Sequence, residues 1–109
     1  MTLFWKTCTL AAALLIAALS LQPPLEAPSP NQIDKLQHFV AYAGLCGLAG
    51  LGWPRLGLGL IVAGTALFGA GIELGQGLMG FGRTASALDM LANLAGAASA
   101  AVLLRIIRK

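Results

Sequence analysis

Four apolar stretches, each close to the length needed to cross a lipid bilayer, take up most of the chain. They run from about residues 3 to 21, 36 to 53, 56 to 79 and 87 to 107. A helix needs about 20 apolar residues to cross the hydrocarbon core, and an isolated strand cannot satisfy its backbone groups there. The sequence therefore predicts an all-α fold, a polytopic membrane protein in which four transmembrane helices form a bundle with short loops.

The chain carries too few charges to cover a water-soluble surface. Of its 109 residues, 58% are hydrophobic and 10% are charged, whereas soluble domains carry about 25% charged residues. The seven basic residues are scattered, so we expect membrane lipids rather than nucleic acid as partners. Cys8 and Cys46 lie within apolar stretches and are expected to be buried without a disulfide. The length fits a single domain, residues 1–109.

The first apolar stretch has an alternative interpretation as a secretory signal peptide, because Lys6 precedes a run rich in Ala and Leu. However, no clear small-x-small cleavage pattern follows, and Ala27 stands directly before Pro28. We therefore expect a retained first helix over about residues 3–21 and keep cleavage as the alternative.

Proline and glycine mark the connections between the stretches. Four prolines within residues 22–32 favour an extended segment. The sequence Trp53-Pro54-Arg55 predicts a tight turn, so the second and third helices should form an antiparallel hairpin. Residues 80–86 make the third connection.

The distribution of Lys and Arg predicts an orientation, because basic residues favour the cytoplasmic side of a membrane. One side would hold five of them: Lys6, Arg55, Arg105, Arg108 and Lys109. The other side would hold Lys35 and Arg83 alone. We therefore expect both termini in the cytoplasm and the two longer loops outside.

Ionisable residues within membrane spans are costly and mark function by default. Asp34, His38 and Tyr42 recur every fourth residue and share one face of the second helix. Glu73 and Gln76 share a face of the third helix near its outer end. These spacings bring polar side chains to similar depths on neighbouring helices.

The fourth helix repeats the pattern, with Asp89 and Asn93 on one face near its outer end and Arg83 in the loop before it. The inner halves of all four stretches are almost wholly apolar. We therefore predict one outward-facing polar cluster. Its candidate members are Asp34, Lys35, His38, Tyr42, Glu73, Gln76, Arg83, Asp89 and Asn93.

Small residues at a spacing of four predict close helix packing near this cluster. Gly71 and Gly75 flank Glu73, while Gly96 and Ala100 continue a similar stripe in the fourth helix.

Structural interpretations stay open for every member of the predicted cluster. A histidine titrates near neutral pH, so His38 suits proton transfer, but it could simply hydrogen-bond Glu73 or Asp89. Glu73 could form an ion pair with Arg83, Lys35 or His38. Tyr42 could be a core aromatic residue, while Asp89 and Asn93 could supply a helix cap and an interhelical hydrogen bond. Lys35 and Arg83 could be contacts for lipid headgroups.

Metal binding and catalysis have little support from the sequence. Asp34, His38, Glu73 and Asp89 could ligate a metal ion, but one histidine with carboxylates and no HExxH or cysteine pair is a weak signal. We therefore predict no metal and no cofactor. No nucleophile elbow or triad spacing is visible, which leaves the question of an enzyme open.

Three motifs in order resemble the VanZ-like family of membrane proteins. Asp34-Lys35-Leu36-Gln37-His38-Phe39 followed by Tyr42 is similar to its D-K-x-x-H-F-x-x-Y signature, and Glu73-Leu74-Gly75-Gln76 to its E-x-x-Q element. The segment from Arg83 to Gly96 resembles its R-x-x-S-x-x-D-x-x-x-N-x-x-G pattern. The resemblance covers about residues 34–103.

This resemblance implies a bacterial integral membrane protein, placed in the inner membrane as a multi-pass chain. The namesake of the family is associated with resistance to teicoplanin, which supplies no reaction for this chain. Our leading hypothesis is a role in binding or modifying a cell-envelope lipid or precursor, with Lys35 and Arg83 attracting a phosphate. The alternatives are a proton-coupled small transporter or channel, which would suit a homo-oligomer, a membrane-embedded acid–base enzyme, and a structural or interaction protein.

Overall fold

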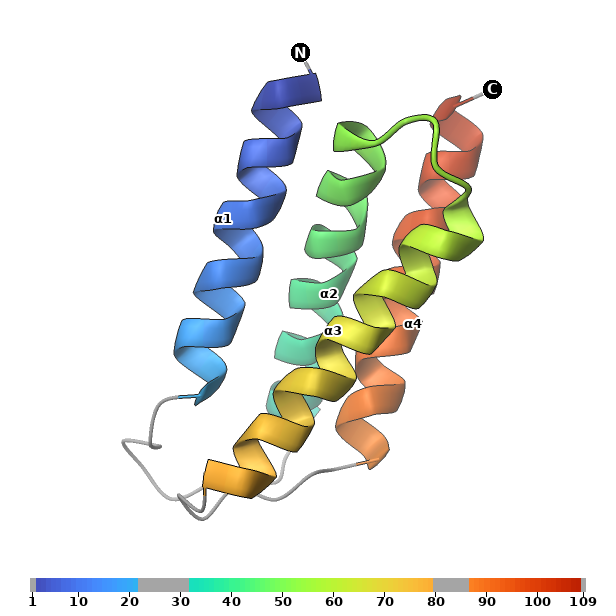
Figure 1. Ribbon diagram of the computed structural model, residues 1–109. Helices are drawn as coiled ribbons and strands as arrows, with labels where there is room; N and C mark the ends of the chain where they lie inside the picture. Colours follow the sequence, from blue (N-terminus) through green and yellow to red (C-terminus); the bar gives the residue numbers. More distant parts are fainter. Residues whose placement is uncertain (1, 22–31, 80–86, 109) are drawn as a thin grey trace.

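The computed structural model describes residues 2–21, 32–79 and 87–108, and of residues 32–35, 79, 87 and 108 it describes the backbone alone. This part of the chain forms four helices (Figure 1). They are α1 (Thr2–Leu21), α2 (Gln32–Gly52), α3 (Leu58–Met79) and α4 (Ala87–Arg108). The predicted all-α class is confirmed, and the helices alternate in direction along the bundle.

Three of the helices, α1, α3 and α4, are long and apolar enough to cross a membrane. The apolar part of α2 is shorter and covers Leu36–Gly52, because its first turn is polar. Helix α2 nevertheless packs against each of the other three helices. It therefore lies at the centre of the bundle's contacts.

The turn between α2 and α3 follows from Pro54. The Trp53 amide still donates to the Ala49 carbonyl at 2.9 Å, and the Leu56 amide then donates to the Trp53 carbonyl at 3.1 Å. The Gly57 carbonyl accepts the first bonds of α3 from Leu60 and Ile61, at 3.1 Å each. The predicted antiparallel hairpin is confirmed.

The most extensive contact in the bundle joins α2 to α4, which run parallel (Figure 1). A methyl group on Gly96 would collide with the Phe39 carbonyl oxygen, and one on Gly50 would collide with the Leu104 side chain. These glycines let the two backbones approach closely. The predicted packing role is thus confirmed for Gly96, but it is wrong for Gly71, where an added methyl group would meet nothing within 4 Å.

Small apolar side chains fill the interior between these helices. The buried cluster consists of Cys46, Ile61, Ala97 and Ala100. Cys8 and Cys46 are both free thiols, as predicted, although Cys8 is only half-buried. The core is thin because each helix is narrow and directs much of its apolar surface outward.

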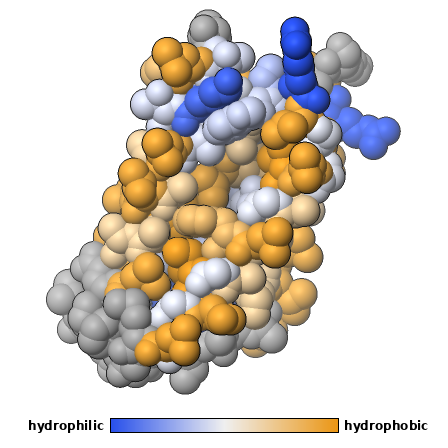
Figure 2. Space-filling view, viewed as in Figure 1, coloured by the Kyte–Doolittle hydropathy of each residue, from blue (hydrophilic) through white to orange (hydrophobic). Residues whose placement is uncertain are grey.

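Large apolar side chains cover the outside of the bundle. Leu3, Leu67 and Leu78 are 75%, 72% and 82% exposed, and many others resemble them. Figure 2 shows apolar residues along the sides and strongly hydrophilic ones gathered at one end. A soluble monomer rarely exposes so much contiguous apolar surface, so the outer face fits lipid better than water.

The two ends of the bundle differ in their polar residues. The end that holds both termini and the α2–α3 turn carries the basic side chains Lys6, Arg55 and Arg105, and we name it the basic end. There the Lys6 ammonium lies 5.6 Å from the centre of the Trp53 ring. At the opposite end, α2 and α4 begin and α3 finishes. We name it the polar end.

Candidate functional site

The polar end brings side chains from three helices together. Because α2 and α4 are parallel and begin at the same end, His38 in the early turns of α2 lies opposite Asp89 and Asn93 of α4. Asp89 stands in the first turn of α4, where the helix dipole favours a negative charge. The third helix, α3, supplies Glu73 from its last turns.

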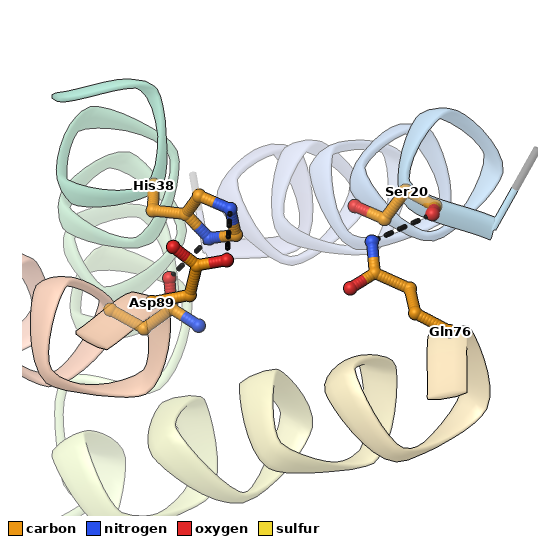
Figure 3. A network of polar contacts seen from close by, with 5 residues as sticks. Ser20, His38, Gln76 and Asp89 are labelled. Atoms are coloured by element: carbon orange, nitrogen blue, oxygen red, sulfur yellow. Dashed lines mark hydrogen bonds and ion pairs between the residues drawn. The ribbon is translucent and has the colours of Figure 1, made fainter. Parts of the chain in front are cut away.

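Both ring nitrogens of His38 contact α4 (Figure 3). Nδ1 lies 2.9 Å from Asn93 Oδ1, and Nε2 lies 3.5 Å from Asp89 Oδ2. The side chains of His38 and Asp89 are 19% and 13% exposed. Asp89, one of the two partners considered for His38, does contact it, and Asn93 forms the interhelical hydrogen bond considered for it.

Glu73 is the most deeply buried member of this group of side chains. The residue is 1% exposed, and its Oε1 atom is inaccessible to solvent. One possible ligand atom from each of His38, Glu73 and Asp89 lies within 4.8 Å of the others. We refer to His38, Glu73, Asp89 and Asn93 as the His38 cluster.

The ring of Tyr42 lies parallel to the ring of His38. The rings of His38 and Tyr42 are stacked, with centroids 6.5 Å apart and planes inclined by 9°. Tyr42 is buried and also contacts Phe68 of α3, at 6.2 Å between ring centroids. The interpretation of Tyr42 as a core aromatic residue is therefore confirmed.

Gly69 is a site residue that the sequence analysis missed. A methyl group there would lie 2.8 Å from Asn93 Nδ2 and 3.0 Å from Tyr42 Cε2, so only glycine leaves room for both side chains. The signal was present in the sequence, because Gly69 stands four residues before Glu73 and therefore shares its helix face.

Gln76 points away from the His38 cluster. Its Nε2 donates to the Ser20 carbonyl of α1 at 2.8 Å, and Figure 3 shows this contact apart from the pair formed by His38 and Asp89. Gln76 therefore fastens α3 to α1. It also gives α1 a polar contact, which the apolar first stretch did not predict.

Three of the candidate residues cannot be placed. Asp34 and Lys35 fall in the first turn of α2, where only the backbone is described, and Arg83 lies outside the described residues. The pairing of Lys35 or Arg83 with Glu73, and the part of these two basic residues in attracting a phosphate, stay predictions.

The hydrogen bond to Asn93 determines which ring nitrogen of His38 carries a proton when the ring is neutral. Asn93 Oδ1 accepts, so His38 Nδ1 is the donor. In a neutral ring, Nε2 is then an acceptor, and it faces Asp89 Oδ2. A lone pair and two carboxyl groups in one place can hold a cation, either a proton shared among them or a metal ion.

Comparison of the chain with models of known protein families, with curated proteins and with solved structures finds no match. The VanZ-like resemblance consequently rests on the three motifs alone. The geometry of the His38 cluster is therefore the basis for any functional conclusion.

Proposed function

We propose that this chain is a small VanZ-like protein of the bacterial inner membrane that binds the polar head of a cell-envelope lipid or precursor. Four helices would cross the membrane, with both termini in the cytoplasm and the polar end outside. The apolar outer face and the three long apolar helices support membrane insertion. The contacts of α2 with all three other helices support a fourth span beside them.

The proposed orientation rests on charge. The basic end carries Lys6, Arg55 and Arg105, and positively charged loops stay in the cytoplasm. The aromatic ring of Trp53 beside Lys6 also fits the level of the lipid headgroups. The His38 cluster would then open toward the outer leaflet.

One observation carries the binding function: three helices place polar side chains in contact at one end of an otherwise apolar bundle, and His38 and Asp89 remain partly exposed. A headgroup at that end would meet an imidazole and a carboxyl group capable of polar contacts. Arg83 and Lys35 belong to the same end by sequence and would attract its phosphate, at about 1 kcal/mol for each basic residue. Modification of the bound lipid would need a reaction for which the sequence has no recognisable motif.

The experiment compares lipid binding to variants at the two ends. The full chain is placed in nanodiscs of phosphatidylcholine that contain a small fraction of phosphatidylglycerol or of a polyprenyl phosphate, and retained lipid is measured by native mass spectrometry. Arg83→Ala should lower retention of the phosphate-bearing probe about fivefold, which corresponds to about 1 kcal/mol. Arg55→Ala at the basic end is the matched control. Equal retention by folded Arg83→Ala and wild-type protein would overturn the proposal.

A structural function is the second candidate, because the bond between His38 and Asn93 joins α2 directly to α4. In this case, the cluster would only fix the packing of the helices. Substitutions would then lower the free energy of unfolding without changing lipid retention per folded molecule.

The transporter hypothesis has less support. Within the described residues, the core toward the basic end is formed by Cys46, Ile61, Ala97 and Ala100. The buried Thr65 hydroxyl there donates to the Ile61 carbonyl of its own helix at 2.8 Å. A proton path would therefore need a second copy of the chain, and absence of pH-dependent flux in liposomes would count against it.

A further inference from the structure

The ligand types in the His38 cluster come from three separate helices. An imidazole from α2, a carboxyl group from α3 and another from α4 lie within 4.8 Å of one another. From the sequence, we considered these three residues as metal ligands but predicted no metal, since motifs such as HExxH depend on ligands in a single helix and none is present. The arrangement is also more selective than a group of surface carboxylates, because Glu73 is fully buried and His38 is packed against Tyr42.

A neutral His38 would leave room for a bound cation in this arrangement. With Nδ1–H donated to Asn93, a neutral His38 directs its Nε2 lone pair toward Asp89. Glu73 brings a second carboxyl group to the same place. Inside a membrane, two carboxylates and a lone pair repel one another unless a positive charge lies between them.

We infer that the His38 cluster is a binding site for a divalent transition-metal ion, with His38, Glu73 and Asp89 as its ligands. Imidazole nitrogen and carboxylate oxygen together suit Zn²⁺ and its neighbours in the first transition row, whereas Mg²⁺ and Ca²⁺ prefer oxygen alone. Zn²⁺ is therefore the probe of choice.

The distances are close to those of a tetrahedral site. Metal–ligand bonds of about 2.0–2.1 Å put neighbouring ligand atoms roughly 3.3 Å apart. The separation between His38 Nε2 and Asp89 Oδ2 is already 3.5 Å. The widest separation within the three-ligand set is 4.8 Å or less, so side-chain rotations that close about 1.5 Å would complete the site.

Asn93 has the position of an outer partner that orients a metal-binding histidine. Such a histidine donates its other ring N–H to a carbonyl or carboxylate, which fixes the tautomer and the direction of the ring. The 2.9 Å contact between His38 Nδ1 and Asn93 Oδ1 meets this requirement. Gly69 in turn leaves the space that the Asn93 amide occupies.

Three protein ligands leave a coordination position open, as in catalytic rather than structural zinc sites. His38 and Asp89 are the partly exposed ligands, while Glu73 is buried beneath them. The open position would thus face the polar end, where a water molecule or a phosphate oxygen could bind. Metal binding itself does not depend on the proposed lipid and is tested without it.

The test uses the full chain, without a histidine tag, in detergent after treatment with a chelator. Titration calorimetry and elemental analysis should give one Zn²⁺ per chain. Glu73→Gln and Asp89→Asn keep the side-chain shapes but remove a direct ligand. Each should weaken Zn²⁺ binding by more than about 100-fold, because loss of an outer partner already weakens it by up to about 100-fold. Asn93→Leu should weaken it by about 10- to 100-fold. Gln76→Leu, one turn from Glu73 but directed at Ser20, is the matched control and should bind as the wild type does.

Two further measurements keep the inference testable if a variant does not fold. Zn²⁺, but not Mg²⁺, should raise the unfolding temperature of the wild-type protein, and a chelator should reverse the increase. Co²⁺ should give visible absorption bands of a low-symmetry site that vanish in Asp89→Asn. If the wild-type protein binds no Zn²⁺ and gains no stability, the cation is a proton and the inference is wrong. Binding that persists unchanged in both carboxylate variants would also overturn it.

Discussion

Helices α2 and α4 contact each other through different kinds of side chain at their two ends. Toward the basic end, the Leu104 side chain fills the space above Gly50, a contact that depends on shape alone. Toward the polar end, His38 meets Asp89 and Asn93, a contact that depends on donors, acceptors and charge. In lipid, apolar packing contributes only van der Waals contact, so a different apolar side chain can often replace it. The polar contact depends on specific donors and acceptors, which is why the proposed function is placed at this end.

The largest expected effect on stability comes from a substitution midway along the contact between α2 and α4, because it should disturb the packing toward both ends. Gly96→Ala places a methyl group against the Phe39 carbonyl and should lower the free energy of unfolding by about 3 kcal/mol, since a backbone cannot move aside as a side chain can. Unfolding by sodium dodecyl sulfate, followed by tryptophan fluorescence, measures this. Gly44→Ala adds the same methyl group where nothing lies within 4 Å and should not destabilise the protein. Equal losses in both variants would show that α2 and α4 do not touch at Gly96.

The next largest effect tests the apolar end alone. Leu104 is 4% exposed and Leu103 is 61% exposed, so the two neighbours form a matched pair. Leu104→Ala should lower the free energy of unfolding by about 2 kcal/mol because it leaves a cavity beside Gly50. Leu103→Ala should lower it by less than about 0.5 kcal/mol. Zn²⁺ affinity should be unchanged in both variants. A weakened metal site in Leu104→Ala would mean that the two ends are coupled, contrary to the comparison.

A smaller effect tests the polar end. Asn93→Leu keeps much of the side-chain volume but removes the acceptor for His38 Nδ1. It should lower the free energy of unfolding by about 1 kcal/mol, because a partly buried donor loses its partner. The same unfolding assay applies. Ser99→Ala, which removes an exposed hydroxyl bonded to the Ala95 carbonyl of its own helix, should have almost no effect. If Asn93→Leu were as stable as the wild type, the hydrogen bond would not stabilise this end.

The smallest effect concerns the attachment of α1. Gln76→Leu removes the bond to the Ser20 carbonyl and should cost about 0.6 kcal/mol, the average for a hydrogen bond between helices in membranes. Thr7→Ala is the control, since the Thr7 hydroxyl donates within α1 to the Leu3 carbonyl. A loss above about 2 kcal/mol would mean that α1 depends on this contact far more than its position suggests.

The lengths of the apolar stretches predicted the positions of the four helices well, but they predicted the first and last residues of the helices less well. The start of α1 and of α4 agree with prediction within one residue. Helix α2 begins at Gln32 rather than Leu36, because a helix can continue beyond its apolar part when water or headgroups satisfy polar side chains. Helix α3 begins at Leu58 rather than Leu56, because the turn after Pro54 uses the Leu56 amide.

The depth of the polar side chains could be predicted from the sequence, but most of their partners could not. Counting residues from each helix end placed His38, Glu73 and Asp89 at the same end, and the structure brings them together. The direction of Gln76 toward α1 depends on how α3 is rotated about its axis. A helix that is apolar on nearly all sides does not encode that rotation. Helix packing decides it, through contacts such as Gly69 with Asn93.

The parallel contact between α2 and α4 also has a consequence for biosynthesis. Because α3 separates the two helices in the chain, His38 and Glu73 leave the ribosome before Asp89 and Asn93 do, and in the proposed membrane setting α2 and α3 would be delivered before α4. Until α4 inserts, these two ionisable side chains lack their partners from that helix, and one charged group in lipid costs about 3 kcal/mol. In the proposed membrane setting, a chain without α4 would therefore be less stable than the full chain. Completion of the His38 cluster coincides with completion of the fold.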